Sequence, residues 1–227
     1  MTKTAILVDG GFYRKRVNHL WGKHSPEETA DALIHYCYRH LTEHHTTHDL
    51  YRIFYYDCPP ISKKMYHPLL GKTVDLGQHE QFKWMNTFLS ELKQRRKVAL
   101  RLGVLDDTNS VYTLRYDVMK KLCSGAISRE DLTENDFIPT IAQKGVDMKI
   151  GIDISSLAYK KQVDQIVLIA GDSDFVPAAK LARREGIDIV LDSLGQPVKE
   201  NLFEHIDGKR SCGNPYKKSA DYSVYKV

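Results

Sequence analysis

The sequence lacks the features that mark membrane, secreted and zinc-ribbon proteins. Among its 227 residues there is no apolar run near the roughly 18 residues that a membrane-spanning helix needs. The four cysteines form no CxxC pair, which argues against a zinc ribbon or a dense disulfide framework and predicts free thiols. The apolar run 5–8 is too short for an export signal and is followed at once by Asp9. We therefore expect a cytoplasmic protein with no membrane association.

Two nucleotide and phosphate chemistries are also disfavoured. The first apolar segment ends in Asp9-Gly10-Gly11-Phe12, which lacks the GxGxxG turn of a dinucleotide-binding Rossmann protein. A haloacid-dehalogenase-like phosphatase would need a second aspartate two positions after Asp9, where this chain has Gly11. The 33 basic residues exceed the 29 acidic ones by only 4, which is compatible with a polyanionic partner but does not demand one.

What the sequence does contain is an alternation of short apolar segments and amphipathic helical segments. It favours βαβ units with a mainly parallel sheet between helices, an α/β fold of three-layer α/β/α type. A capping box at Ser25-Pro26-Glu27-Glu28 opens the first clear helix. The expected strands are 4–8, 50–56, 98–105, 165–170 and 187–191, with a turn at 106–110 and a hairpin strand at 111–114, and the expected helices are 25–43, 80–96, 147–159 and 175–185.

Two segments lack such a pattern. Residues 116–136 fit neither a helix nor a strand clearly, and residues 208–227 combine Gly, Pro, Ser, Lys and Tyr without a period. We expect one domain over residues 1–207 and a C-terminal tail over 208–227 that is mobile or docks on another surface. Docking of this tail on a neighbouring subunit would make the protein a homo-oligomer.

Acidic residues follow the strands at the positions where a parallel α/β sheet forms its functional crevice. Asp9 ends the first strand, Asp172 and Asp174 follow strand 165–170, and Asp147 opens a helix. Carboxylates gathered in this way repel one another unless a cation is bound, and hard oxygen ligands suit Mg²⁺ or Mn²⁺. The pattern therefore indicates a divalent-metal site.

Three motifs in the same order resemble a known family. The segments Ile6-Leu-Val-Asp-Gly-Gly-Phe12, Lys144-Gly-Val-Asp147 and Ala170-Gly-Asp-Ser-Asp-Phe-Val-Pro177 are similar to those of the NYN-domain family, the LabA-like branch of PIN-like metal-dependent ribonucleases. The resemblance spans about residues 3 to 206. It implies a PIN-like fold and a divalent-metal-dependent ribonuclease, acting as an endonuclease on single-stranded or structured RNA.

The resemblance also implies roles for individual residues. Asp9, Asp147 and Asp172 would hold Mg²⁺ or Mn²⁺ and form the catalytic set, with Asp174 as a further ligand or a neighbour of the ligands. Asp153 is a weaker metal candidate, because six residues of helix rotate about 600° and turn it away from Asp147. The metal would polarise a phosphate oxygen and lower the pKa of bound water, so no protein nucleophile is needed.

Cations and aromatic rings near the acids are candidates for RNA contact. Lys144 and Lys149 flank Asp147, while Arg14 and Lys15 follow Asp9 closely enough to bind phosphates. Phe12 and Tyr13 are candidates for stacking on bases. Phe12 also departs from the family, since some members carry asparagine three residues after the first aspartate.

Simpler interpretations stand beside these. Asp147 and Asp174 each precede a helix and are candidate N-caps. His40, His44, His45 and His48 have helical spacing, but no cysteine or acid stands at ligand spacing, so a zinc site is disfavoured. The competing function is a catalytically silent NYN-fold protein that binds RNA or a protein partner as a regulatory scaffold.

Overall fold

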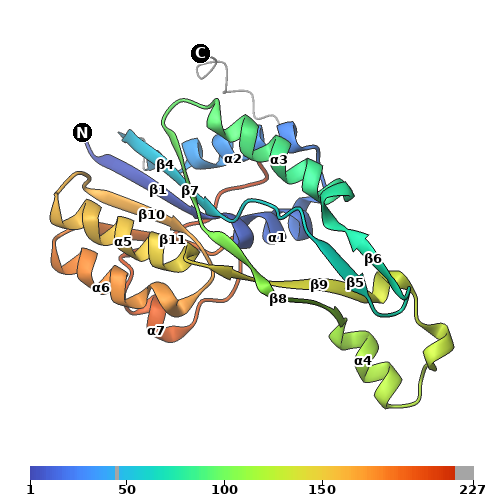
Figure 1. The fold of residues 1–227 in the computed structure, drawn as a ribbon. Helices are drawn as coiled ribbons and strands as arrows, with labels where there is room; N and C mark the ends of the chain where they lie inside the picture. The colour runs from blue at the N-terminus through green and yellow to red at the C-terminus, as the bar shows by residue number, and fades with distance from the viewer. Residues whose placement is uncertain (44–45, 218–227) are drawn as a thin grey trace.

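A six-stranded parallel sheet forms the centre of the protein (Figure 1). The structure, a computed structural model, describes residues 1–43 and 46–217. The strand order is β12-β11-β10-β1-β4-β7, and every neighbouring pair is parallel. The strands are β1 (Lys3–Asp9), β4 (Asp49–Asp57), β7 (Val98–Leu102), β10 (Gln165–Ile169), β11 (Asp188–Asp192) and β12 (Gly208–Lys209).

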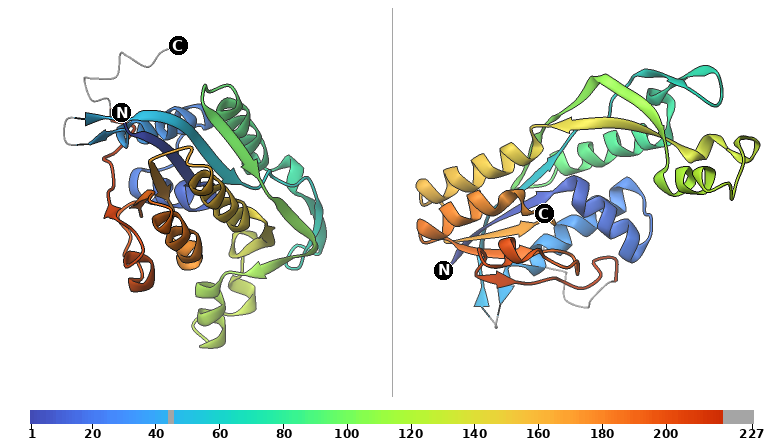
Figure 2. Two further views of the ribbon diagram at one scale, coloured as in Figure 1. Left: turned by 90° about the vertical axis from the view of Figure 1, so that its left-hand side faces the viewer. Right: turned by 90° about the horizontal axis from the view of Figure 1, so that it is seen from below.

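Helices cover both faces of this sheet (Figures 1 and 2). Side chains alternate along β1, so Ile6 and Val8 pack with one group of helices while Ala5 and Leu7 pack with the other. The first group is α1 (Gly10–Trp21), α2 (Pro26–Arg39) and α3 (Glu80–Lys93); the second is α5 (Val146–Tyr159), α6 (Val176–Arg184) and α7 (Glu200–Phe203). This is the predicted three-layer α/β/α architecture. No helix in the described ranges is long and apolar enough to cross a membrane.

Helix α2 confirms the predicted start and corrects the predicted end. Ser25 and Glu28 form the capping box, with proline at the first helical position. The helix ends at Arg39 instead of continuing to residue 43, because 42–43 (β2, Thr42–Glu43) pairs with β3 (Thr46–Thr47). Arg210 donates to the backbone carbonyls of His40 and Thr42, so a residue far along the chain satisfies this helix end.

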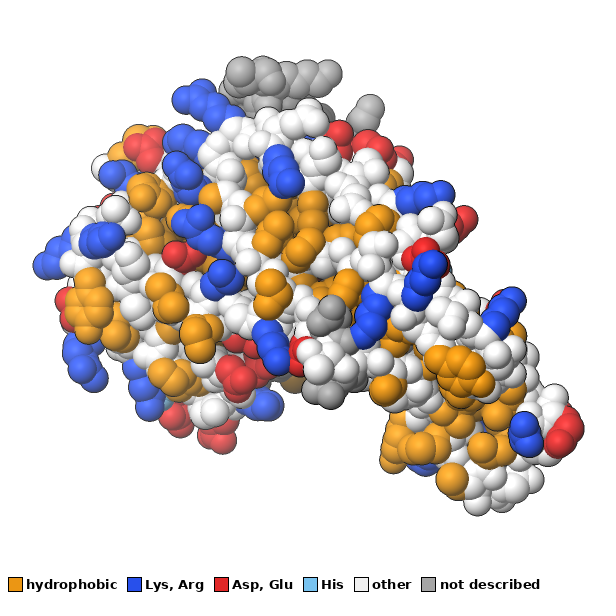
Figure 3. Space-filling view, in the orientation of Figure 1, with side chains coloured by type: hydrophobic (Ala, Val, Ile, Leu, Met, Phe, Trp, Pro, Cys, Tyr) orange, Lys and Arg blue, Asp and Glu red, His pale blue; other side chains and the backbone are white. Residues whose placement is uncertain are grey.

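A long antiparallel pair, here called the arm (residues 104–144), leaves the sheet after β7 (Figure 1). It contains β8 (Val104–Leu114), α4 (Tyr116–Cys123) and β9 (Phe137–Lys144), with two short 3-10 turns before β9. The hairpin of β5 (Lys64–His67) and β6 (Lys72–Asp75) lies beside it, where His67 contacts the rings of Tyr112 and Phe137. Hydrophobic side chains gather at its far end (Figure 3). Segment 116–136, which has no clear sequence pattern, thus folds as the end of the arm.

The arm overturns two expectations about residues 98–114. Strand 98–105 is interrupted at Gly103, and the predicted turn 106–110 lies inside β8. Asp106 pairs with Ala142, and Val111 pairs with Thr140. Between these two pairs β8 contains more residues than β9, so the register shifts. The backbone of 106–110 is accommodated in this irregularity because β9 supplies a partner strand on either side of it. Local composition was therefore overridden by a long-range pairing.

The first part of the tail packs on the rest of the chain. Gly208 and Lys209 pair with β11, although the sequence shows no strand period there. Cys212 and Tyr216 pack against the core, and the Tyr216 ring stacks on His24 at a centroid distance of 3.7 Å. Docking of residues 208–217 is thus intramolecular, while the predicted mobility of 218–227 concerns residues outside the described ranges.

Two histidines of the disfavoured zinc site, His40 and His48, have separate partners. His40 is buried and its Nε2 lies 2.9 Å from Asp192 Oδ2, whereas His48 lies beyond the helix and contacts Thr4 and Gln165. His44 and His45 lie outside the described residues. His40 instead helps to tie α2 to β11.

Gly103, at the junction of sheet and arm, is expected to tolerate no side chain. A Cβ atom there would lie 2.6 Å from the backbone oxygen of Lys144 and 2.9 Å from Val146 Cγ2. Gly103→Ala should therefore lower the free energy of unfolding by about 1–3 kcal/mol, as measured by urea denaturation.

The matched control is Gly151→Ala in the interior of α5. Its Cβ would meet Ala178 Cβ at 4.0 Å, an ordinary contact, and alanine is the better helix former by about 1 kcal/mol. We expect this variant to be more stable than the wild type. Equal stability of Gly103→Ala and wild type would contradict the close packing at the junction.

Candidate active site

The carboxyl ends of the central strands bring acids together from distant parts of the sequence. Asp9 ends β1, Asp57 ends the neighbouring β4, and Asp172 follows β10 by three residues. Asp9 is in register with Tyr56 of β4, and the preceding Val8 is in register with Ile169 of β10. Because these strands are parallel and in register, the acids that follow them lie at one edge of the sheet.

Asp9 is the most perturbed of these acids. Its Oδ1 accepts a hydrogen bond from the backbone N–H of Phe12 at 3.1 Å, which caps α1. Burial nevertheless raises the pKa of Asp9 to about 6; the bond from Phe12 opposes this, and repulsion from Asp147 and Asp57 adds to it. Asp9 is thus a carboxylate whose negative charge the surrounding protein leaves poorly compensated.

Asp147, Asp172 and Asp174 continue the acidic group. Asp147 is the second residue of α5, whose N-cap Gly145 has the left-handed conformation, φ 83°. Partial desolvation raises the pKa of Asp147, with further contributions from the charges of Asp172 and Asp174. Together with Asp9, these residues form a chain of mutually repelling carboxylates, and all but Asp9 are exposed to solvent.

The alternative capping interpretations of Asp147 and Asp174 are wrong. Helix α5 has Gly145 at its N-cap and α6 has Phe175, in both cases without a side-chain cap hydrogen bond. Asp172 does cap locally, since its Oδ1 accepts from the backbone N–H of Asp174 at 3.2 Å. The carboxylates of Asp147 and Asp174 are therefore not explained by helix capping.

The donor set suits a hard divalent cation, which oxygen ligands of this charge bind best. Raised pKa values at Asp9 and Asp147 are the mark of acids that a cation would stabilise. The carboxylates do not, however, converge on one point: within residues 1–43 and 46–217, no three His, Cys, Asp or Glu side chains are gathered closely enough to hold a metal ion. The chemistry thus fits a metal, while the coordination would require these side chains to move closer.

Asp57 is a site residue that sequence reasoning missed. It is 1% exposed and accepts three hydrogen bonds from Arg14: Nε to Oδ2 and Nη2 to Oδ1, each at 3.0 Å, and Nη2 to Oδ2 at 2.9 Å. Tyr55 and the backbone N–H of Cys58 also donate to it. Its place at the end of a strand beside β1 was the available signal. Arg14, predicted to contact phosphate, is committed to Asp57 through Nε and Nη2.

Asp153 does not belong to the acidic group. Its Oδ2 accepts from Arg101 Nε at 2.9 Å and from the Tyr56 hydroxyl at 2.8 Å. The charge of Asp153 is therefore balanced by Arg101 of β7, so Asp153 is not part of the proposed ligand set.

Of the two aromatic residues predicted to stack on bases, Tyr13 serves packing instead, while the stacking role of half-buried Phe12 stays a prediction. Tyr13 is fully buried and meets Tyr36 edge to face at a centroid distance of 6.1 Å, so it has no surface to offer a base. Its spacing from Val17, also buried, places both on the inner face of α1. Phe12 covers Gly171: a Cβ atom on that glycine would lie 2.4 Å from Phe12 Cε2. The departure from the asparagine of other family members therefore has a packing role.

The lysines predicted to bind phosphate all lie on the surface. Lys15 and Lys149 are exposed, and Lys144 is exposed with its Nζ 2.6 Å from Asp106 Oδ2. Lys199, which sequence reasoning missed, donates to Ser173 Oγ at 3.2 Å, between Asp172 and Asp174. No local motif marks Lys199, because only the fold brings it to this turn.

The parallel sheet, its two helical layers and the acids at one edge define the PIN-like nuclease fold. The family model of the NYN domain matches residues 71–203, and the chain belongs to this family. The match contains Asp147, Asp172 and Asp174, whereas Asp9 lies before it.

Beyond the family, the chain is similar to an uncharacterized protein of Methanocaldococcus jannaschii, with 27% identity over 62 residues. These residues make up 27% of this chain and 26% of the archaeal protein, so the similarity covers about a quarter of each. No solved structure matches the chain significantly.

Proposed function

We propose that this protein is a divalent-metal-dependent ribonuclease of the LabA-like type that hydrolyses RNA phosphodiester bonds as an endonuclease. The observation that carries the proposal is the chain of uncompensated carboxylates Asp9, Asp147, Asp172 and Asp174 at the edge of a PIN-like sheet. Neighbouring carboxylates that repel one another in this way destabilise the fold and are typical of functional sites. The four free cysteines suit a reducing compartment, and we propose the cytoplasm as the place of action.

The residues divide the work as follows. Asp9, Asp147 and Asp172 would hold Mg²⁺ or Mn²⁺, with Asp174 beside them. The bound ion supplies Lewis acidity toward a phosphate oxygen and a more acidic water. Lys144, Lys149, Lys15 and Lys199 supply positive charge around the acids for the RNA backbone. Because Asp147, Asp172 and Asp174 are exposed, an RNA strand can pass over them without a free end, which favours internal cleavage.

One observation favours a second candidate. The acids in the described ranges do not gather three ligands around one point, which suits a catalytically silent scaffold that binds RNA or a protein through the same fold. This alternative predicts binding without turnover, in the presence or absence of metal.

A circular single-stranded RNA separates these candidates. With Mn²⁺ or Mg²⁺ we expect the wild-type protein to linearise the circle, because an endonuclease needs no end. EDTA and Asp172→Asn should each abolish this cleavage, since both remove the cation or one of its oxygen ligands. The products are measured on a denaturing gel.

Asp117→Asn is the matched control, because Asp117 lies exposed on α4 of the arm and pairs only with Arg115 in the described contacts. It should cleave like the wild type. Binding of the circle without cleavage under every metal condition would support the scaffold and contradict the nuclease.

A further inference from the structure

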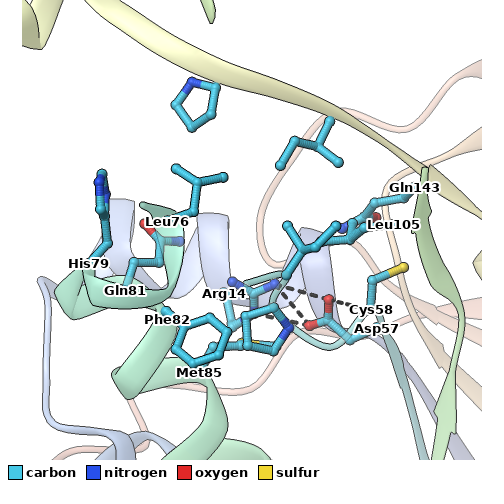
Figure 4. A pocket seen from close by; sticks show the side chains of 14 residues that line it. Arg14, Asp57, Cys58, Leu76, His79, Gln81, Phe82, Met85, Leu105 and Gln143 are labelled. Atoms are coloured by element: carbon cyan, nitrogen blue, oxygen red, sulfur yellow. Dashed lines mark hydrogen bonds and ion pairs between the residues drawn. The ribbon is translucent and has the colours of Figure 1, made fainter. Parts of the chain in front are cut away.

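A hollow of ≈ 230 Å³ lies between the sheet, α3 and the arm (Figure 4). The hollow is lined by the end of β4 and the residues after it, the start of α3, and β9, with single residues from α1, β8 and the 3-10 turn before α3. In the close-up, Leu76, His79 and Gln81 stand on one side, Leu105 and Gln143 on the other, and Arg14 between them. The arm therefore makes a pocket that the α/β/α core alone would lack.

The hollow opens beside the acidic group. A Cβ atom placed on Gly11 would lie 3.5 Å from Asp9 Oδ1 and 3.8 Å from Gln143 Oε1, so both oxygens flank this glycine. Gln143 also lines the hollow, as does Asp57, whose charge raises the pKa of Asp9. A group bound in the hollow would thus lie next to a phosphate bound at the acids.

The lining combines apolar walls with flat polar groups. Phe82, Met85, Leu105 and Ile141 supply the apolar surface. The guanidinium plane of Arg14 is fixed by Asp57, and their charges balance, so the hollow attracts neither strong anions nor cations. The amides of Gln81 and Gln143 can each donate and accept hydrogen bonds. A flat, neutral, heteroaromatic ring suits this lining. Its faces can pack on the apolar side chains and on the guanidinium plane, and its polar edge can form hydrogen bonds with the two amides.

An adjoining hollow extends the path. It shares Arg14 and Gln81 with the first and adds Lys23, His24 and Trp84. Glu80 also lines this second hollow and offsets the charge of Lys23, so the second hollow adds an aromatic ring and polar groups without a net charge.

We propose that the first hollow binds one nucleobase of the RNA substrate, the base of a nucleotide next to the scissile phosphate. The inference rests on the proposed function, because it takes RNA at the acidic group as its starting point. It assigns the arm a role in selecting where the strand is cut, since base seating fixes the register of the backbone over the acids.

The test is a binding scan in EDTA, which prevents cleavage. A fluorescently labelled single-stranded octaribonucleotide is compared with versions that carry one abasic site at each position in turn, and affinity is measured by anisotropy. For the wild type we expect one position at which loss of the base weakens binding about tenfold, the effect of one stacked base. A flat scan would overturn the proposal.

Two substitutions on one strand locate the effect. Ile141→Trp fills the hollow and should weaken binding of the intact RNA about tenfold and flatten the scan. Ile138→Trp stands on the same strand, is 47% exposed and does not line the hollow, so it should behave like the wild type. Gln81→Ala, an exposed lining residue that adds no bulk, should reduce the abasic effect without any change in folding. Wild-type scans from both Ile141→Trp and Gln81→Ala would place the base elsewhere and contradict the proposal.

The outcomes distinguish this proposal from the one on which it rests. A position-specific scan with no cleavage in Mn²⁺ would support the base site and contradict the nuclease. Cleavage in Mn²⁺ with a flat scan would support the nuclease and overturn the base site.

Discussion

Asp9→Asn is expected to reduce RNA cleavage by about 10²–10⁴-fold, because the variant loses one anionic oxygen ligand worth several kcal/mol of transition-state stabilisation. The same substitution should make the protein more stable at pH 7. Burial and neighbouring acids raise the pKa of Asp9 to about 6, so its ionised form is unfavourable in the folded state. Asparagine removes that charge and retains an oxygen that can accept the Phe12 N–H bond at the start of α1.

The pH dependence follows from the raised pKa. Between pH 4 and 6 the folded protein holds a proton on Asp9 that the unfolded chain has released, so wild-type stability falls as pH rises through this window. The penalty is absent below pH 4 and fully present above about pH 6. After allowing for partial exposure to solvent, we expect Asp9→Asn to gain about 1–2 kcal/mol at pH 7 and to lose this part of the pH dependence.

Urea denaturation at pH 4 and pH 7 measures both effects, with cleavage assays alongside. Asp153→Asn is the control, since Asp153 is neutralised by Arg101 and should leave cleavage intact. Mn²⁺ should raise the melting temperature of the wild type but not of Asp9→Asn, because a ligand stabilises only the state that binds it. An Asp9→Asn variant that cleaves RNA normally would exclude Asp9 from the site.

Removing Arg14 is expected to cause the largest loss of stability. Arg14→Met leaves the carboxylate of Asp57, which is 1% exposed, without its cation. An uncompensated buried charge of this kind costs about 3–5 kcal/mol. For a chain of this length the melting temperature should fall by roughly 2–4 °C per kcal/mol. Differential scanning calorimetry and urea denaturation measure the loss.

A double variant tests the cause. Arg14→Met with Asp57→Asn removes both charges and should recover part of the lost stability, because the stranded carboxylate is gone. Arg115→Met is the exposed counterpart: Arg115 and Asp117 are 47% and 57% exposed, and breaking such a pair costs at most about 1 kcal/mol. If Arg14→Met were no more harmful than Arg115→Met, the Arg14–Asp57 pair would not support this edge of the sheet.

Much of the core fold was predictable because its signals are local. Strands such as 4–8 are buried on both faces and show as uninterrupted apolar runs, and the Ser25 capping box fixes the start of α2. The errors occur where a distant partner decides the local structure. Residues 106–110 favour a turn by composition but lie inside β8, because Asp106 and Val111 on either side pair with β9. The end of α2 depends on Arg210.

The candidate site divides along the same line. The arrival of Asp9 and Asp172 at one edge of the sheet was predictable, since the carboxyl ends of parallel strands share an edge. Asp147 acts on Asp9 from the first turn of α5. The pairing of Arg14 with Asp57 and the arrival of Lys199 beside Ser173 depend on tertiary contacts that no spacing encodes. The prediction that Tyr13 stacks on bases is wrong, because Tyr13 lies on the buried face of α1. The spacing of Tyr13 from Val17 is a local sign of that face.

Strand β1 can pair on both sides only late in synthesis, because one of its two neighbours in the sheet lies far along the chain. This strand is made early, yet it lies between β4 and β10, and β10 is translated more than 150 residues later. Until then the β1–β4–β7 half of the sheet has an open edge that can pair wrongly, and such long-range parallel pairing is slow to form. Asp9 and Asp172 come to the same edge of the sheet only when β10 pairs with β1. The proposed site would therefore stay incomplete in a nascent chain until most of the domain has been made.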